Sequence, residues 1–420
     1  MYLLVDANNF YASCEKVFDP RLAARPVAVL SNNDGCVVAC SAELKALGFK
    51  IGTPYHENRD FFARHNVHAC SSNYALYGDM SARVMRILGT FAAEVEPYSI
   101  DEAFLETDAA APGACVALAK RIRATVLRST GLPVSVGVAP TKTLAKIANR
   151  AGKKSPEGVF AMPENPREAR AFLNAVEVGD IWGIGEGFAK RLRTLGVDTA
   201  LKLAEMPQPL IREHFNACVS RTAWELLGNP CLEAEDAAQP AQSAGCSRSF
   251  NAPLTAPEPL REAVMHYAAI ACEKVRRDRL RATGINFYFR HFEDYKSRHQ
   301  TGGFIFGGAT FPQPMSDTSA IMNAIAPIFD KVYRPGLKYR KAGVLLYGLV
   351  SRDTWQPDLF MPPVPPESDR LNDCIDALNR KLGRGAVFRL AEGTSRSWTM
   401  RRAHLSPRYT TNWDELPEVK

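Results

Sequence analysis

The order of strand and helix patterns in the first 140 residues is the feature that most limits what this chain can fold into. Short apolar runs of strand length alternate there with amphipathic stretches that repeat at the helical period. Strands are expected at 2–5, 27–30, 95–100, 104–106 and 133–139, and helices in "AELKALG", "YALYGDMSARVMRILG" and "ACVALAKRIRATVLRSTG". This series predicts one mixed sheet covered by helices, which is an α+β arrangement.

Two adjacent acids, Asp101 and Glu102, interrupt the apolar segment "YSIDEAFLE" (98–106) and need a counter-charge. Asp6 ends the first predicted strand, so three carboxylates can gather at one end of the sheet, where their hard oxygens suit Mg²⁺. Neighbours on a flat strand point to opposite faces, and both acids reach a metal only if a turn or bulge intervenes. Spacing alone leaves a second interpretation open, in which the pair are surface acids at a hairpin.

Length and composition predict a globular protein of two to four domains. A chain of 420 residues exceeds what one core usually supports, and 46% hydrophobic with 23% charged residues excludes a disordered chain. The apolar runs are too short to cross a membrane, and "MYLLVDANNF" does not resemble a signal peptide, so a cytoplasmic location is expected. The ten cysteines lack a paired C-x-x-C pattern, which favours reduced thiols over a zinc site.

The positive charge of the chain is concentrated in one segment. Residues 242–350 contain fifteen Lys or Arg and eight Asp or Glu, so their net charge of +7 equals that of the whole chain. This asymmetry suggests a polyanionic partner, with a solvated charged face as the alternative. The stretches 234–245 and 361–369 have the composition of linkers.

Five stretches occur in an order that resembles the successive motifs of the Y-family translesion DNA polymerases. They are "LLVDANNFYASCE", "SNNDGCVVACSAELKALGFKIG", "SSNYALYGDMS", "YSIDEAF" and "SVGVAPTKTLAKIANRAGKK". The similarity extends along the chain and is greatest to the UmuC-type branch of that family. It implies an error-prone, template-directed DNA polymerase that acts in the SOS response, adds dNTPs to a primer 3′-hydroxyl and has no proofreading activity.

The resemblance also implies a right-hand polymerase with an additional domain. The expected divisions are a palm at 1–10 and 75–165, fingers at 11–74, a helical thumb at 166–235, a little-finger domain at 242–350, and a region at 351–420 with a clamp motif and a UmuC-type C-terminus.

The resemblance assigns the metal and nucleotide sites residue by residue. Asp6, Asp101 and Glu102 match the catalytic acids that hold two Mg²⁺ ions, with the carbonyl of Ala7 as a further ligand. Tyr11 matches the steric gate, whose ring fills the space that a ribose 2′-hydroxyl needs.

The remaining nucleotide contacts depart in part from the wider family pattern. Phe10 is expected to help form the sugar pocket, and Lys45 and Lys153 to contact the triphosphate. Many members have Arg where this chain has Lys45, and Lys lacks the bidentate geometry of Arg. A proline that often follows the second lysine is missing, which leaves Lys153 and Lys154 as alternatives.

Two parts of the chain are predicted to bind primer–template DNA. "DIWGIGEGFAKRLRTLGV" (180–197) fits a helix–hairpin–helix in which Gly183 and Gly185 let backbone N–H groups approach a phosphate; an ordinary helical turn is the alternative. In the little finger, phosphate contacts independent of base sequence are expected. The candidates for these are Arg248, Lys274, Arg276 and Arg277.

The stretch "WQPDLFMPPVPP" (355–366) resembles the bacterial sliding-clamp motif, with Gln356, Leu359 and Phe360 as the binding residues. Besides the clamp, the resemblance implies a UmuD′-like dimer and RecA as partners, and no membrane. A DNA-binding accessory protein that keeps the fold without the chemistry is the alternative function. A palm-type cyclase would not need the hairpin, the basic segment or the clamp motif.

Overall fold

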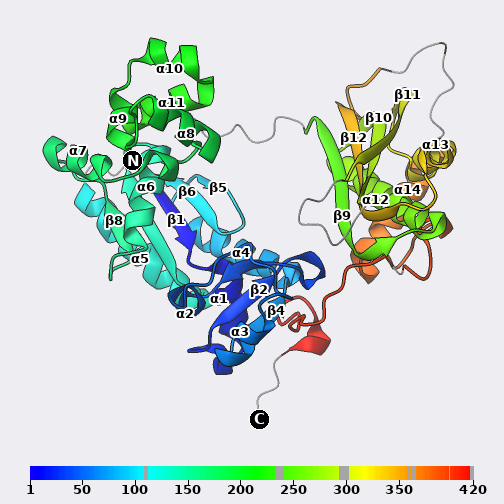
Figure 1. The fold of residues 1–420 in the computed structure, drawn as a ribbon, viewed down its shortest axis with the longest axis horizontal. Helices are drawn as coiled ribbons and strands as arrows, with labels where there is room; N and C mark the ends of the chain where they lie inside the picture. Colours follow the sequence, from blue (N-terminus) through cyan, green and yellow to red (C-terminus); the bar gives the residue numbers. More distant parts are fainter. Residues whose placement is uncertain are drawn as a thin grey trace. The chain divides into compact units, whose positions relative to one another are not determined.

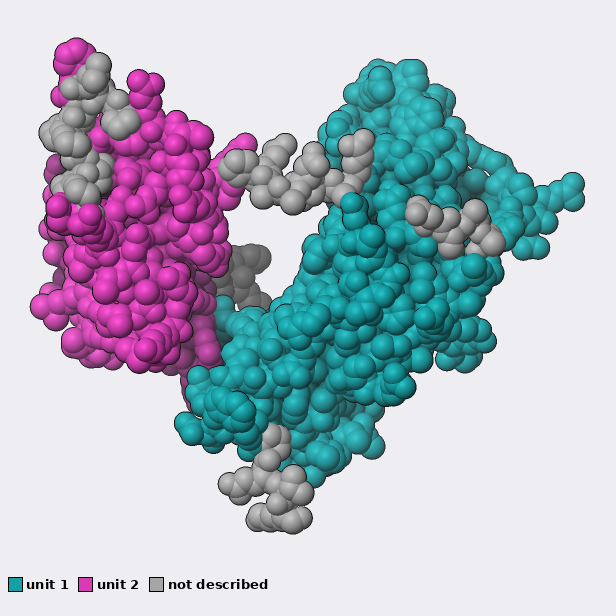
Figure 2. Space-filling model, turned by 180° about the vertical axis from the view of Figure 1, so that it is seen from behind, with its two compact units in different colours: residues 1–237, 403–420 teal, residues 238–402 magenta. Residues whose placement is uncertain are grey.

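The computed structural model divides the chain into two compact units, which Figure 1 shows as a ribbon and Figure 2 in two colours. The residues that it describes are 1–107, 112–232, 241–292, 302–356, 360, 366–396 and 398–416. Unit 1 comprises residues 1–237 and 403–420, and unit 2 comprises residues 238–402. The C-terminal region that was predicted as one piece is therefore divided between the two units. None of the described helices is both long and apolar enough to span a bilayer.

A five-stranded mixed sheet forms the centre of unit 1, in the order β5-β6-β1-β7-β8. Its strands are β1 (Tyr2–Ala7), β5 (Val95–Pro97), β6 (Glu102–Glu106), β7 (Val134–Ala139) and β8 (Val159–Ala161). The helices around it are α1 (Phe10–Phe18), α4 (Tyr74–Leu88), α5 (Pro112–Thr130) and α6 (Lys142–Gly152). β1 runs antiparallel to both β6 and β7, and β7 runs parallel to β8. This arrangement confirms the predicted mixed α+β fold.

The central strand β1 is buried on both faces of this sheet. Leu3 and Val5 pack into one apolar cluster, whereas Leu4 packs into another. Helix α6 lies very close to β7 at Gly137, where an added Cβ would stand 2.2 Å from the backbone nitrogen of Asn149. Only glycine permits this approach, and it brings the lysines of α6 to the sheet.

A smaller three-stranded sheet lies in the region predicted as fingers, in the order β3-β2-β4. Its elements are η1 (Pro20–Leu22), β2 (Val27–Leu30), η2 (Asn32–Asp34), β3 (Val37–Cys40), α2 (Ala42–Ala46), α3 (Arg59–Arg64) and β4 (His68–Ser71). Ser71 at the end of β4 forms a parallel bridge with Leu405, so the described part of the C-terminal segment (residues 403–416) joins the edge of this sheet. That segment contains η5 (Trp413–Glu415).

The region predicted as a thumb consists of short helices. They pack on α6 and on the face of the central sheet that carries Leu4. They are α7 (Pro166–Asn174), η3 (Val178–Asp180), α8 (Glu186–Thr194), α9 (Ala200–Glu205), α10 (Gln208–His214) and α11 (Ala217–Leu226). The buried carboxylate of Glu225 ties them to the sheet region, since the backbone N–H of Thr143 donates to it at 2.8 Å. These helices and the sheet therefore share one core.

Unit 2 is built on a four-stranded antiparallel sheet in the order β11-β10-β12-β9. Its elements are β9 (Ser243–Leu254), α12 (Pro257–Arg277), β10 (Leu280–Phe292), β11 (Phe304–Met315), α13 (Thr318–Val332), β12 (Lys338–Ser351), α14 (Pro366–Leu382) and η4 (Leu390–Glu392). The core of this unit lies between the sheet and helices α12 and α13. Trp398, from beyond α14, is buried in the same core.

Candidate active site

The three predicted metal-binding acids lie at one end of the central sheet. Asp6 is directly opposite Glu102 in the antiparallel pairing of β1 and β6, which places both side chains on the same face. Asp101 precedes β6, and its carbonyl accepts a hydrogen bond of 2.8 Å from the backbone N–H of Ala7. The structure therefore brings together the residues that the sequence separates by almost one hundred positions.

A tight turn before β6 interrupts the regular strand, as the adjacent acids Asp101 and Glu102 would need in order to face the same site. The strand predicted over 95–100 ends at Pro97, and the backbone N–H groups of Tyr98 and Ser99 both donate to the carbonyl of Glu102. The hydroxyl of Ser99 donates to Asp101 Oδ1 at 2.5 Å and fixes that carboxylate. Because Asp101 lies in the turn and not on a flat strand, strand alternation does not force its side chain onto the face opposite Glu102.

Two lysines supply the counter-charges. Lys153 Nζ lies 2.7 Å from Asp6 Oδ2, and Lys146 Nζ lies 2.9 Å from Glu102 Oε1. Three carboxylates beside two ammonium groups leave one net negative charge. Burial raises the pKa of Asp6, and the nearby Lys153 opposes that rise. The charges of Asp6 and Glu102 are therefore balanced by lysines at the site itself.

Lys146 was missed by the sequence reasoning. Its ammonium group also lies 4.0 Å from the centre of the Tyr98 ring and 5.0 Å from that of Trp182, which adds cation–π attraction. A signal was present, because Lys146 and Lys153 are seven residues apart, which is two helical turns. That spacing puts both on one side of α6 and its C-cap.

The donors of the site fit a hard cation. In the described part of the chain, no group of three His, Cys, Asp or Glu side chains converges closely enough to hold a metal ion in this conformation. Two of the acids are instead turned toward lysines. The available donors are the three carboxylates and the carbonyl of Ala7, all of them oxygens, and Mg²⁺ needs only one or two protein carboxylates besides water and phosphate. The residues present therefore fit Mg²⁺.

Tyr11 and Phe10 follow β1 directly and have different surroundings. Phe10 is only 4% exposed and belongs to the core of unit 1. Tyr11 is partly exposed and stacks on Tyr77, with ring centroids 4.4 Å apart and planes 16° apart. Tyr74 meets the same ring edge-on at 6.3 Å. Of these two aromatic side chains, Tyr11 is therefore the one that can face a ligand.

The predicted triphosphate lysines differ in their distance from the acids. Lys45, on α2, donates to Asn9 Oδ1 at 2.5 Å, so it lies beside the start of α1. Asn9 has a left-handed backbone conformation with φ of 51°. Both Lys153 and Lys154 are exposed, and Lys153 forms an ion pair with Asp6. Of the two alternatives, Lys153 is the one that the structure places at the acids.

The glycines of the predicted hairpin form the entrance to α8. Gly183 has φ of +83°, a conformation that other residues rarely adopt. Gly185 is the N-cap of α8, and Ile184 between them is buried. The N–H groups at the start of α8 therefore follow a tight turn, as a phosphate-binding hairpin requires.

The predicted DNA-binding cations of unit 2 are not equivalent. Arg276 is 8% exposed and forms a bidentate ion pair with Asp376, which ties α12 to α14. Lys274 Nζ donates to the carbonyl of Gly245. Arg277 is exposed beside Asp278. The buried pairing gives Arg276 a structural role in the described part of unit 2.

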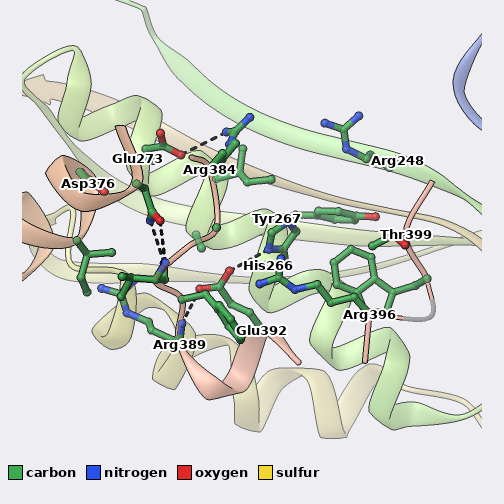
Figure 3. Close-up of a pocket in the computed structure, with 18 of the residues that line it drawn as sticks. Arg248, His266, Tyr267, Glu273, Asp376, Arg384, Arg389, Glu392, Arg396 and Thr399 are labelled. Atoms are coloured by element: carbon green, nitrogen blue, oxygen red, sulfur yellow. Dashed lines mark hydrogen bonds and ion pairs between the residues drawn. The ribbon is translucent and has the colours of Figure 1, made fainter. Parts of the chain in front are cut away.

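Arg248 lines a cavity of about 460 Å³ between α12, α14 and the residues that follow α14 (Figure 3). Its guanidinium lies 3.6 Å from the sulfur of Met400. His266 and Glu392 line the same cavity, and His266 Nδ1 lies 2.9 Å from Glu392 Oε2. Arg248 therefore belongs to a junction within unit 2 as well as to strand β9.

The residues of the predicted clamp motif are only partly described. Gln356 is exposed, and Phe360 is 94% exposed. Leu359 lies outside the described residues. Exposure of Phe360 agrees with a docking peptide, and the motif remains a prediction.

Comparison with family models matches most of the chain. The impB/mucB/samB family model matches residues 5–150, and the model of its C-terminal domain matches residues 241–359. A domain of unknown function, DUF4113, matches residues 369–419.

Curated relatives cover the full length. Protein UmuC of Salmonella typhimurium strain LT2 is 44% identical, with 100% of both chains covered. Protein ImpB of Salmonella typhimurium is 39% identical, with 99% of both chains covered. DNA polymerase IV of Pelotomaculum thermopropionicum is 26% identical over 92% of this chain and 94% of that protein.

Solved structures share the fold. A Y-family DNA polymerase chimera of Dbh and Dpo4 has a TM-score of 0.66 at 22% identity, and covers 83% of this chain and 99% of its own. An insertion ternary complex of Dbh DNA polymerase has a TM-score of 0.52 with the same coverage and identity.

Proposed function

Since this chain belongs to the impB/mucB/samB family, we propose that it is a Y-family DNA polymerase that performs translesion synthesis by metal-dependent nucleotidyl transfer. The observation that carries the proposal is the meeting of Asp6, Asp101 and Glu102 at one end of the β1–β6 pair, with Lys153 beside them. Primer extension by the purified chain tests it. A DNA-binding accessory protein would have no use for three acids gathered at one site.

The residues of the site have separate tasks in this proposal. Two Mg²⁺ ions, held by Asp6, Asp101, Glu102 and the carbonyl of Ala7, would activate the primer 3′-hydroxyl and stabilise the leaving pyrophosphate. Tyr11 excludes a nucleotide with a 2′-hydroxyl by filling its space. Lys45 and Lys153 bind the triphosphate of the incoming dNTP by charge.

Primer–template DNA is proposed to bind through phosphate contacts. The hairpin at Gly183 and Gly185 offers backbone N–H groups, and unit 2 offers exposed cations such as Arg277. Such contacts are independent of base sequence and weaken as salt increases. The wider assignment, including a UmuD′-like dimer and RecA as partners and a cytoplasmic location, rests on the resemblance to the UmuC-type branch.

We expect Lys153→Ala to raise the KM for dNTP by about tenfold or more, because a charged hydrogen bond to the triphosphate is lost. Steady-state insertion of a single nucleotide measures this. Lys154→Ala is the matched control, since it removes the same charge one residue away. An equal rise for both variants would contradict the assignment of Lys153.

We also expect substitution of both Leu359 and Phe360 by Ala to abolish stimulation by the sliding clamp. Each apolar side chain contributes about 1.5–3 kcal/mol when buried in a groove, and tethering raises the effective concentration at a primer end. Primer extension and co-elution, each with and without clamp, measure the effect.

Leu382→Ala is the control for the clamp variant, because Leu382 is a leucine beyond β12 with 63% exposure. It should leave clamp stimulation intact. If the double variant loses activity equally with and without clamp, these residues belong to the folded core and the motif assignment fails.

A further inference from the structure

We propose that the C-terminal segment sets the sugar selectivity of the active site, because Ser406 and Glu15 hold Tyr77 against the ring of Tyr11. This inference rests on the proposed function, in which Tyr11 is the sugar gate. It gives part of the region matched by a domain of unknown function a role in substrate choice. Glu15, Tyr77 and Ser406 act as positioning residues, since none of them is placed against the nucleotide.

The first link runs between helices α1 and α4. Tyr11 and Glu15 are four residues apart on α1, so their side chains lie one above the other on the same face. Tyr77, from α4, covers both: its ring stacks on Tyr11 at 4.4 Å, and its hydroxyl donates to Glu15 Oε1 at 2.6 Å. The hydrogen bond from the Tyr77 hydroxyl to Glu15 therefore determines where the Tyr77 ring lies against Tyr11.

Glu15 itself needs support because it is 2% exposed. Burial raises the pKa of this carboxyl, and hydroxyl groups of Tyr77 and Ser406 and the thiol of Cys70 oppose that rise by hydrogen bonding. Ser406 Oγ donates to the same oxygen as Tyr77, at 3.1 Å. A buried acid that loses a donor pays a desolvation penalty or moves. Ser406 thus contributes to holding Glu15 in the position that Tyr77 requires.

The C-terminal segment is anchored on both sides of Ser406. On one side, the backbone N–H of Ala403 donates to Asp34 Oδ2 at 2.8 Å. On the other side, the ring of Tyr409 stacks on Phe18 with centroids 5.0 Å apart. These anchors fix Ser406 relative to the sheet and to the end of α1.

Asn73 connects this anchored segment directly to the helix that carries Tyr77. Its Oδ1 accepts from the backbone N–H of Leu76 as the N-cap of α4, while its Nδ2 donates to the carbonyl and hydroxyl oxygens of Ser406 at 3.1 and 3.0 Å. The C-terminal segment therefore holds both α1, through Glu15, and the first turn of α4. Tyr77 lies on that first turn and moves with it.

The test compares single-nucleotide insertion of ribonucleotide and deoxyribonucleotide by full-length variants Ser406→Ala and Glu15→Gln. We expect the preference for deoxyribonucleotide to fall by about five- to tenfold, as loss of one hydrogen bond to a buried carboxylate or of its charge allows. The kcat for deoxyribonucleotide should remain within about twofold of the wild-type value, because Asp6, Asp101 and Glu102 are unchanged. Thr411→Ala, which removes an exposed hydroxyl from the same segment, should change neither value.

A double-mutant cycle separates positioning from general destabilisation. If Glu15 acts through Tyr11, Tyr11→Ala with Glu15→Gln should have the same sugar preference as Tyr11→Ala alone. Additive effects, or unchanged preference in both single variants, would overturn the inference. Unchanged preference in Tyr11→Ala would instead remove the gate assignment of the proposed function, so the two failures are distinguishable.

Discussion

Asp101→Ala is expected to reduce nucleotide addition by on the order of 10³-fold or more, because the loss of a metal ligand removes several kcal/mol of transition-state stabilisation. DNA affinity should stay within a few-fold, since it depends on backbone N–H groups and cations elsewhere. Primer extension and a DNA-binding titration on the same preparation measure the two effects.

Glu106→Ala is the matched control for this prediction. Glu106 is an exposed acid at the far end of β6, opposite Tyr2 and four residues from Glu102. Its removal changes the net charge by the same amount without touching the site, so extension should persist. Retained extension by Asp101→Ala in Mg²⁺ would refute the assignment of the acids.

Tyr11→Ala is expected to raise ribonucleotide insertion relative to deoxyribonucleotide by on the order of 10²-fold, the discrimination that shape gives for one added hydroxyl. The ring excludes the 2′-hydroxyl by occupying its space, so trimming it admits both sugars. The ratio of kcat/KM for the two nucleotides measures the change.

Phe10→Leu provides the comparison for Tyr11. Phe10 is buried in the core, so its substitution should lower the free energy of unfolding and leave the sugar ratio nearly unchanged. If the sugar ratio changes on substitution of Phe10 and not of Tyr11, then Phe10 is the steric gate and the assignment of Tyr11 is wrong.

Local patterns predicted most of the palm-like sheet. Apolar runs such as 2–5 and 133–139 are strands because they are buried on both faces. The turn or bulge that both Asp101 and Glu102 would need to reach a metal is present as a turn, which Ser99 and Tyr98 close before β6. The periodicity of apolar residues and the local composition suffice to predict such strands and turns, because these features depend on residues that are neighbours in the sequence.

Local patterns did not identify the partners in contacts between residues that are distant in the sequence. Nothing near Glu102 in the sequence indicates that Lys146 pairs with it, because the contact exists only once α6 packs on the sheet at Gly137. Likewise, Arg276 was a candidate phosphate contact at a basic helix end, whereas packing of α14 buries it against Asp376. The tie from Ser406 to Glu15 spans 391 positions. Tertiary packing decides all three.

Primer extension by the purified chain across an abasic template in Mg²⁺ tests the central claim most directly. The reaction is run with the protein alone and with a UmuD′-like dimer and a RecA filament, and with Asp101→Ala under the same conditions. The account predicts that the wild-type chain adds nucleotides opposite and beyond the lesion in at least one condition and that Asp101→Ala adds none. Binding of the primer–template without extension in every condition would contradict it and would favour a DNA-binding accessory protein.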